Sequence, residues 1–398
     1  DQQVSDRGIQ EAAGAARLVL REFTTYAGTG SPAFQGEGGP ASEAGMYQPT
    51  GGAVDTRGNV YISTDHRVRR VDAATGVITT LAGTGRNRTG GDGGPAADAT
   101  LAEPKGLALD GVGNLFIVEN GGGLVRRVDA STGVITTVAG GGFGNPREKM
   151  FGDGKQATEA FLKNPDDIAV DNEGSLYIAT DNRIRKVEAA TGIIDTVAGT
   201  GERGLEGDGG PATSAGLAEP IAVAVDNQGN IFIVDSENHR IRKVDVANGI
   251  MTTAVGIGKH YARTPYAYQG LQQAEQQALA PVYDTSKAAA TGAGYAGDGA
   301  PATQATLQTP SAIGLDADGN IFIADGGVRV RKVDVSTGVI STVVIGETET
   351  TARTGKLQII TTSIGSIVSM AVDGGGEIFL ADYKNNVVHK VAAPAARP

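Results

Sequence analysis

The chain is 398 residues long and contains no cysteine, which excludes disulfide bonds and thiolate metal sites. Its 34 Lys and Arg residues and 45 Asp and Glu residues give a formal net charge of −11. An acidic protein is a poor partner for nucleic acid, because binding to phosphate backbones requires a basic surface. No apolar run is long enough to span a bilayer as a helix, so we predict neither a nucleic-acid partner nor a membrane span.

Residues 1–21 lie outside any repeat, and we expect them to form an N-terminal arm. Apolar residues such as Ile9, Val19 and Leu20 are compatible with a short helix. The arm is either loosely held, as chain ends often are, or docked on another subunit or a partner. The sequence begins at Asp1 rather than Met, which fits a removed signal peptide. We therefore expect a secreted, periplasmic or cell-surface protein.

From residue 22 onward one unit recurs, and residues 207–256 hold its clearest copy. The copy contains four short runs rich in Ile and Val, each bounded by Gly, Asn or Asp, which is typical of strands joined by tight turns. The runs are apolar at nearly every position, as expected for strands that are buried on both faces of their sheet. The predicted strands are Ile221–Asp226, Ile231–Asp235, Ile241–Asp245 and Ile250–Val255.

An aspartate ends the first run of every copy and shows that the chain holds six units. Six units of four antiparallel strands predict an all-β fold, a six-bladed β-propeller over residues 22–391. The last unit stops after its third strand, Val387–Val391, and Glu22–Gly28 (EFTTYAG) matches the fourth strand of other units. We therefore predict that the N-terminal strand completes the last blade, which leaves 392–398 as a C-terminal tail. The six aspartates are Asp55, Asp110, Asp171, Asp226, Asp316 and Asp373.

Five of the six connectors between units carry one acidic residue in a glycine-rich segment such as GDGGPA. The Pro–Ala run that follows suits one helical turn with Pro near its start. Symmetry should place the five acids in a broken ring on the face that the connectors share, and we call this set the connector-face acidic ring. Its members are Glu37, Asp92, Asp153, Asp208 and Asp298.

The acidic ring has two interpretations. Hard cations such as Ca²⁺ take carboxylate oxygens, so the ring is a candidate cation site. The alternative is that each acid accepts backbone N–H bonds within its own loop. We favour the second interpretation, because a calcium loop places several oxygens close together and each connector offers one carboxylate. The sequence therefore predicts no metal and no other cofactor, with Ca²⁺ as the alternative.

The fourth connector is enlarged by an insertion at residues 258–295. Long insertions on rigid scaffolds often carry function, and Tyr is favoured at protein interfaces. The tyrosines of the insertion are therefore candidate partner-binding residues, or else they anchor the insertion onto the propeller. Five of the ten tyrosines of the chain lie there, namely Tyr261, Tyr266, Tyr268, Tyr283 and Tyr295.

The repeat resembles the NHL-repeat propellers through the pattern P-x-x-[IL]-A-V-D-x-x-G-N-[IL]-[FY]-I-[AV]-D-x-x-x-[HN]-R-I-R-K-V-D. Pro220–Asp245 fits it most closely, and Pro104–Asp129, Pro165–Glu188 and Pro310–Asp334 are variants. The GDGGPAT connector is similar to that of bacterial secreted members of the family and of the teneurin propeller. The resemblance implies a six-bladed propeller and leaves the function open, since one fold hosts unrelated activities.

Two further motifs have structural interpretations. The recurring R-[IV]-R-[RK]-V, followed by an acidic residue, predicts paired charges between blades rather than a phosphate site. Among the histidines, His66 and His239 share one repeat position, His389 lies in a third strand and His260 in the insertion. Propeller enzymes similar in shape, such as peptide-amidating and antibiotic-inactivating lyases, rely on histidines that converge on a metal. The predicted positions in this chain do not converge, so we predict no catalytic residue.

The sequence therefore favours a non-enzymatic propeller that binds a protein partner or assembles with copies of itself through the connector face, above all through 258–295. One alternative is a propeller enzyme, a lyase or hydrolase with a cation at the channel mouth. Another is a carbohydrate-binding module, in which tyrosines stack on sugars.

Overall fold

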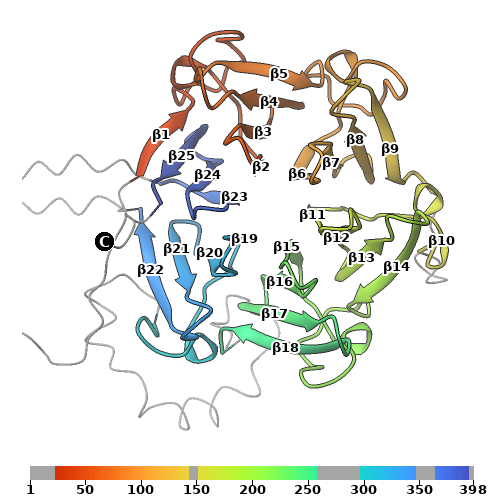
Figure 1. The fold of residues 1–398 in the computed structure, drawn as a ribbon, viewed down its shortest axis with the longest axis vertical. Coiled ribbons are helices and arrows are strands. Elements are labelled where there is room, and N and C mark those ends of the chain that lie inside the picture. The colour runs from red at the N-terminus through yellow and green to blue at the C-terminus, as the bar shows by residue number, and fades with distance from the viewer. Residues whose placement is uncertain (1–22, 143–150, 258–295, 347–363, 394–398) are drawn as a thin grey trace, which may run out of the picture.

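The computed structural model of the protein describes residues 23–142, 151–257, 296–346 and 364–393. Its strands form six antiparallel sheets arranged as blades around a central axis (Figure 1). The predicted six-bladed all-β propeller is therefore confirmed. Within the described ranges, none of the helices has the length and apolar character that a membrane span needs.

Each blade begins with an innermost strand at the axis and ends with an outermost strand at the rim. Blade 1 contains β2 (Gly51–Val54), β3 (Val60–Thr64), β4 (Arg67–Val71) and β5 (Ile78–Ala82). Blade 2 contains β6 (Pro104–Leu109), β7 (Leu115–Glu119), β8 (Leu124–Val128) and β9 (Ile135–Gly140). Blade 3 contains β11 (Asp167–Val170), β12 (Leu176–Thr180), β13 (Arg183–Val187), β14 (Ile193–Ala198) and the two-residue β10 (Lys155–Gln156).

The second half of the ring repeats this order. Blade 4 contains β15 (Pro220–Val225), β16 (Ile231–Asp235), β17 (Arg240–Asp245) and β18 (Ile250–Val255). Blade 5 contains β19 (Ala312–Leu315), β20 (Ile321–Asp325), β21 (Arg329–Val333) and β22 (Ile340–Ile345). Blade 6 contains β23 (Ile367–Val372), β24 (Ile378–Asp382), β25 (Val387–Val391) and the N-terminal β1 (Phe23–Ala27).

The predicted strands agree with the observed ones to within one residue, and the main difference lies at Asp226. The sequence assigned Asp226 to the first strand, whereas β15 ends at Val225. The carboxylate of Asp226 instead accepts hydrogen bonds from the backbone N–H groups of Gln228 and Asn230, at 2.9 and 2.8 Å. This side-chain bonding holds the tight turn into β16, which is a usual role for aspartate in turns.

The core lies between the blades rather than in one central mass. In one apolar cluster, Val234 and Ile241 of blade 4 pack with Ile323 and Ile340 of blade 5 and with Leu307 of the connector between them. The second strand of each blade is buried along its whole length, as the continuous apolar runs predict. Burial of this apolar surface between neighbouring sheets stabilises the ring.

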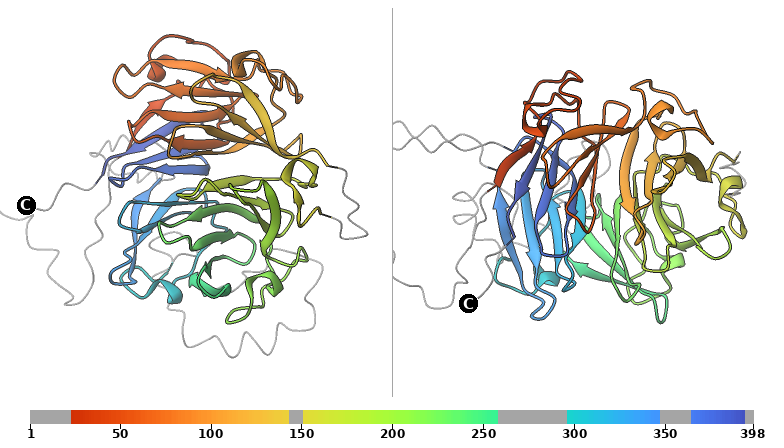
Figure 2. Two further views of the ribbon diagram at one scale, coloured as in Figure 1. Left: turned by 45° about the vertical axis from the view of Figure 1, so that its right-hand side comes forward. Right: turned by 45° about the horizontal axis from the view of Figure 1, so that its top comes forward.

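The ring closes through the N-terminal strand. In blade 6, β1 pairs antiparallel with β25, and the register matches Phe23 with Val391 and Thr25 with His389. Figure 2 shows from two further sides that β1 joins the C-terminal strands in one blade. The predicted closure is confirmed, and it places residues from opposite ends of the chain in one sheet.

Each connector with the glycine-rich motif contains a single turn of 3₁₀ helix, as the Pro–Ala run predicts. Just before this turn, the connector pairs with the outer strand of the blade that it enters. In blade 1, Gly38 N–H donates to Ile78 O at 2.9 Å and Ile78 N–H donates to Gly39 O at 3.0 Å. The turns are η1 (Ala41–Glu43), η2 (Ala96–Asp98), η4 (Ala157–Glu159), η5 (Ala212–Ser214) and η6 (Ala302–Gln304).

Candidate functional site

The five acids of the connector-face ring each form an ion pair with an arginine of the third strand of the same blade. Asp153 Oδ1 lies 2.6 Å from Arg185 Nη2, and Asp208 Oδ1 lies 2.9 Å from Arg242 Nη2. The arginine side chains are 0–1% exposed, whereas the acids are 36–51% exposed. The pairs are Glu37–Arg69, Asp92–Arg126, Asp153–Arg185, Asp208–Arg242 and Asp298–Arg331.

These ion pairs correct one detail of the sequence interpretation. The arginines of the repeated basic motif are paired, as predicted, but their partners do not lie in a neighbouring blade. The second arginine of the motif pairs with the connector that enters its own blade. In blades 1 to 3 the third basic residue pairs with the acid that follows its strand, whereas Lys332 of blade 5 lies 4.0 Å from Asp316. Arg70 Nη2, for example, lies 3.0 Å from Asp72 Oδ2. The motif therefore fastens connectors to blades.

The carboxylates of the connector-face acidic ring make contacts that hold the connectors to the blades. In blade 1, Glu37 Oε1 accepts the backbone N–H of Thr80 at 2.6 Å, while Oε2 accepts the Thr80 hydroxyl at 2.9 Å. A cation at this place would face the buried guanidinium of Arg69. Within the residues that the structure describes, no three His, Asp or Glu side chains gather closely enough to hold a metal ion. The absence of a cofactor stays a prediction.

The tyrosine-rich insertion 258–295 lies outside the described residues, so the roles of Tyr261, Tyr266, Tyr268, Tyr283 and Tyr295 stay predictions. The residues that flank the insertion are described. Ile257 N–H donates to Ala305 O at 3.0 Å, and Ala296 forms an isolated bridge with Thr306. Arg331 Nη2 also donates to Ala296 O at 3.2 Å. The insertion therefore leaves and re-enters the propeller beside the 3₁₀ turn η6, on the connector into blade 5.

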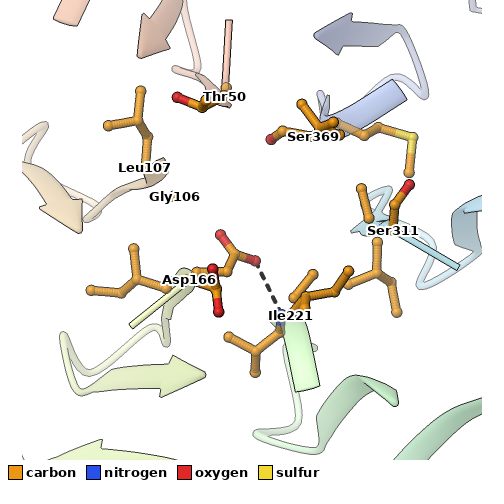
Figure 3. A pocket seen from close by; sticks show the side chains of 16 residues that line it. Thr50, Gly106, Leu107, Asp166, Ile221, Ser311 and Ser369 are labelled. Atoms are coloured by element: carbon orange, nitrogen blue, oxygen red, sulfur yellow. Dashed lines mark hydrogen bonds between the residues drawn. The ribbon is translucent and has the colours of Figure 1, made fainter. Parts of the chain in front are cut away.

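The described residues line a partly open cavity of about 100 Å³ on the propeller axis, and Figure 3 shows it from close by. All six blades contribute to it through the start of their innermost strands. The surroundings are mostly backbone and small or apolar side chains, interrupted by a few polar groups. Among the lining residues are Thr50, Gly106, Asp166, Asp167, Ser311 and Ser369.

Asp167 is the one carboxylate of this cavity without a cationic partner among the described residues. Its Oδ2 accepts the backbone N–H of Val223 in the next blade at 3.0 Å, the contact dashed in Figure 3. Burial raises the pKa of Asp167 to about 7, and the nearby Asp166 adds to the effect. The adjacent Asp166 differs, because Lys105 Nζ lies 2.5 Å from its Oδ1. The cavity thus holds one carboxyl group that changes its charge near neutral pH.

Asp167 depends on a glycine in the neighbouring blade. A Cβ atom at Gly106 would overlap both the Oδ1 and the Cα of Asp167. The first strands of blades 2 and 3 therefore approach so closely that only glycine fits opposite the carboxyl group.

Sequence reasoning missed Asp167, although the signal is present in the repeat. Its position is occupied by Gly, Ala or Ser in the other five blades, namely by Gly51, Gly106, Ala222, Ala312 and Ser369. A repeat explains the residues that its copies share, so the informative residue is the one that breaks the pattern. Aligning the six copies position by position would have singled out Asp167.

The described histidines do not lie together. His66 and His239 sit in loops between second and third strands, both with positive φ, at 55° and 54°. His389 is buried in β25, where its Nε2 lies 3.2 Å from Asp382 Oδ2. His260 lies outside the described residues.

With the fold and these sites in place, comparison with known proteins assigns the chain to a family. A protein-family model described as the teneurin NHL domain matches residues 144–206, 202–282 and 284–364, which is more than half of the chain. The chain therefore belongs to the teneurin NHL-domain family of NHL-repeat propellers, and the resemblance seen in the sequence is confirmed.

Individual relatives match only part of the chain. It is 24% identical over 245 residues to SUPPRESSOR OF QUENCHING 1, chloroplastic, of Arabidopsis thaliana, a match that covers 58% of this chain and 23% of that protein. It is 27% identical over 256 residues to teneurin-3 of Mus musculus, which covers 61% of this chain and 8% of that protein. The chain thus spans less than a quarter of the length of these curated relatives.

Solved structures share the fold at low sequence identity. A structural genomics protein of unknown function from Bacteroides thetaiotaomicron has a TM-score of 0.58 at 16% identity, with 93% of this chain and 75% of that chain covered. A gluconolactonase from Xanthomonas campestris has a TM-score of 0.52 at 14% identity, with 97% and 94% covered. At such identities the likeness shows the propeller fold alone.

Proposed function

We propose that this propeller is a non-enzymatic module that binds a protein partner or further copies of itself through its connector face, at a secreted, periplasmic or cell-surface location. The observation that carries the proposal is the size of the axial cavity. Small-molecule sites usually enclose about 300–1,000 Å³. The cavity formed by the described residues holds about 100 Å³, enough for a few water molecules but not for an organic substrate.

The charges of the connector face support the same proposal. The acidic ring is engaged by buried arginines and by threonines of the outer strands, so its carboxylates hold the connectors in place. The connectors of the ring differ in length and sequence. Binding surfaces are often built in this way, with variable loops on a fixed scaffold.

The insertion 258–295 is the part of the connector face that we propose as the contact surface. Its flanking residues, Ile257 and Ala296, are fixed by hydrogen bonds at η6, so the insertion starts from a defined place on the rim. Its five tyrosines combine apolar rings with polar hydroxyl groups, a composition that suits protein interfaces.

The experiment is a deletion with a matched control. One variant replaces 258–295 by a short Gly-Ser linker, and the control makes the same replacement at 143–150 in the connector between blades 2 and 3. Melting temperature and circular dichroism check folding, and light scattering on a sizing column measures assembly. Binding to a protein partner is measured by testing each variant against surface-exposed proteins of the source organism. We expect the first variant alone to lose assembly or binding. Unchanged behaviour of the folded variant would refute the proposal.

One observation favours the enzymatic alternative, namely the pairing of Asp167 with Asp166 at the axis. A carboxyl group with a pKa raised to about 7, beside a second carboxyl group that forms an ion pair with Lys105, is an arrangement used in acid–base catalysis. A screen against lactones and glycosides would test this alternative, with Asp167→Asn as the inactive comparison. If the wild type hydrolyses one of these substrates and Asp167→Asn does not, the protein is a hydrolase and our proposal is wrong.

A further inference from the structure

The axial cavity lies at the end of the propeller where the connectors enter the blades. Each connector leads into an innermost strand, and the cavity is lined by the first residues of those strands. The polar groups of the cavity therefore belong to the connector-face end of the axis. Figure 3 shows four polar residues from different blades around the same space, namely Thr50, Asp166, Ser311 and Ser369.

Two hydroxyl groups of the cavity already donate their protons to the neighbouring blade. Thr50 Oγ1 donates to Pro104 O at 2.7 Å, and Ser311 Oγ donates to Ile367 O at 2.8 Å. A hydroxyl group carries a single proton and two lone pairs, so each of these oxygens can only accept a further hydrogen bond. The two side chains therefore offer acceptors, and no donors, to a ligand in the cavity.

The carboxyl groups of the cavity are not matched by positive charge. Lys105 pairs with Asp166, whereas Asp167 has no cationic partner among the described residues. Burial raises the pKa of Asp167 to about 7, because water no longer stabilises its ionised form and no cation replaces it. The described residues that line the cavity include no Lys, Arg or His. The cavity therefore favours a ligand that is positively charged and donates hydrogen bonds.

The size of the cavity selects among cations. Its volume of about 100 Å³ corresponds to roughly three water molecules, which suits the terminal –CH₂–NH₃⁺ group of an amine. A primary ammonium group has three donors and no acceptor, which matches a carboxylate and two hydroxyl oxygens. A calcium ion fits less well, because it takes about six to eight oxygen ligands. Within the described chain, no three acidic or histidine side chains gather closely enough to hold a metal ion.

We propose that the axial cavity is a binding site for a primary ammonium group, in which Asp167 pairs with the charge and Thr50 and Ser311 accept hydrogen bonds. The group is the end of a free alkylamine or of a lysine side chain in a protein partner, since both present the same chemistry. Only this end enters the cavity, in keeping with its volume. The site uses residues of the propeller alone, so the inference goes beyond the proposed function and does not depend on 258–295.

The test measures binding of n-butylammonium to the full chain by titration calorimetry, with n-butanol as a neutral probe of similar shape. Asp167→Asn removes the charge but keeps an oxygen that accepts the backbone N–H of Val223. Asp318→Asn is the matched control, because it removes an exposed carboxylate in the turn between β19 and β20, at the other end of the innermost strand. A thermal melt without ligand checks that each variant is folded.

We expect n-butylammonium to bind the wild type and Asp318→Asn alike, and to bind Asp167→Asn more weakly by about tenfold or more, because the ammonium loses its charge partner. The wild-type affinity should also fall about tenfold for each pH unit below about 7, since a proton then occupies Asp167. Asp167→Asn should lack this pH dependence. Asp166 and Lys105, the other charged groups at the cavity among the described residues, are present in both proteins.

Two blocked peptides distinguish the sources of the amine, one with a central lysine and one in which that lysine is acetylated. Tighter binding of the lysine peptide than of n-butylammonium identifies a lysine of a protein partner, and the reverse identifies a free amine. The inference is overturned if neither amine binds saturably, if n-butanol or the acetylated peptide binds equally well, or if Asp167→Asn binds undiminished. Binding of Ca²⁺ that Asp167→Asn abolishes and n-butylammonium does not displace overturns it too. The deletion of 258–295 tests the proposed function separately.

Discussion

His389 Nε2 lies 3.2 Å from Asp382 Oδ2 inside blade 6, at the position where each of the other five blades buries an arginine. The neighbouring strand β1 pairs with β25 in the same sheet, and Phe23 contacts the His389 ring edge to face with 5.1 Å between ring centroids. Blade 6 therefore uses a different polar contact in its interior, in the one sheet that the two ends of the chain build together.

The first prediction concerns this pair. Burial favours the neutral form of Asp382, but hydrogen bonds from His389 and from the backbone of Gly365 and Ser366 lower its pKa to about 2. His389→Ala removes one of these donors and leaves a cavity, so we expect the free energy of unfolding to fall by about 1–3 kcal/mol. Urea titration measures the loss. His389→Gln keeps a donor and should lose less, and equal losses would show that Asp382 does not depend on the contact.

The second prediction concerns Arg126 in blade 2, which pairs with both Glu119 and Asp92. Glu119 is completely buried, whereas Asp92 is about half exposed. Arg126→Met strands the Glu119 carboxylate without its cation and should cost about 3–5 kcal/mol, because an unpaired buried charge is strongly destabilising. Asp92→Asn should cost about 0–1 kcal/mol, since water already screens that side of the pair.

A double variant separates the charge from the fold. Glu119→Leu combined with Arg126→Met replaces the buried pair by apolar side chains, and we expect it to recover most of the stability lost in Arg126→Met. Denaturant titrations of the wild type, Arg126→Met, Asp92→Asn and the double variant give the free energies of unfolding to be compared. A double variant as unstable as Arg126→Met would mean that the arginine acts through its shape and its contacts to the connector backbone.

The third prediction is a pH dependence from Asp167, whose pKa rises from 3.8 to about 7 on folding. Between these values the folded protein holds a proton that the unfolded chain has released, so stability falls as the pH rises from about 4 to about 7 and is level above that. The loss is at most about 1.4 kcal/mol per pH unit, and less where water enters the cavity.

Asp167→Asn removes this titration, so the wild type and the variant should differ more in stability at pH 8 than at pH 4, with the variant the more stable at pH 8. Thermal melts across the pH range provide the measurement. Asp325, whose pKa burial also raises to about 7, is present in both proteins and cancels in the difference. Parallel pH profiles would show that Asp167 stays ionised in the folded state.

The fourth prediction tests the close approach of blades 2 and 3. Gly106→Ala places a methyl group against Asp167, and we expect a loss of about 1–3 kcal/mol from overpacking. Gly52→Ala in blade 1 is the control, because the nearest atoms to a Cβ there lie 3.9 Å away. Denaturant titration of both variants should show a loss in the first alone, and equal stability of the two would mean that the inner strands can separate without cost.

Several features followed from the sequence because they are local and repeated. Runs of Ile and Val between Gly, Asn and Asp specify strands and turns by short-range preferences. The chain holds six copies of the unit, and the last copy lacks its fourth strand, so residues 22–28 must supply that strand and close the ring. The closure is confirmed by the pairing of Phe23 with Val391. The five acidic residues of the connectors, such as Glu37 and Asp92, were also recognised as one symmetric set, because they recur at the same position in successive repeats.

The tertiary structure alone decided which charges meet and which polar groups lie in the axial cavity. Glu37 and Arg69 are separated by 32 residues and become partners only when the connector folds back over its blade. Asp167 acquires its pKa from the enclosure of six first strands that are far apart in the chain. Such properties depend on distances between segments and on the exclusion of water, which no local pattern encodes. Strands and turns, in contrast, arise from a few neighbouring residues, and the number of blades follows from the number of repeats.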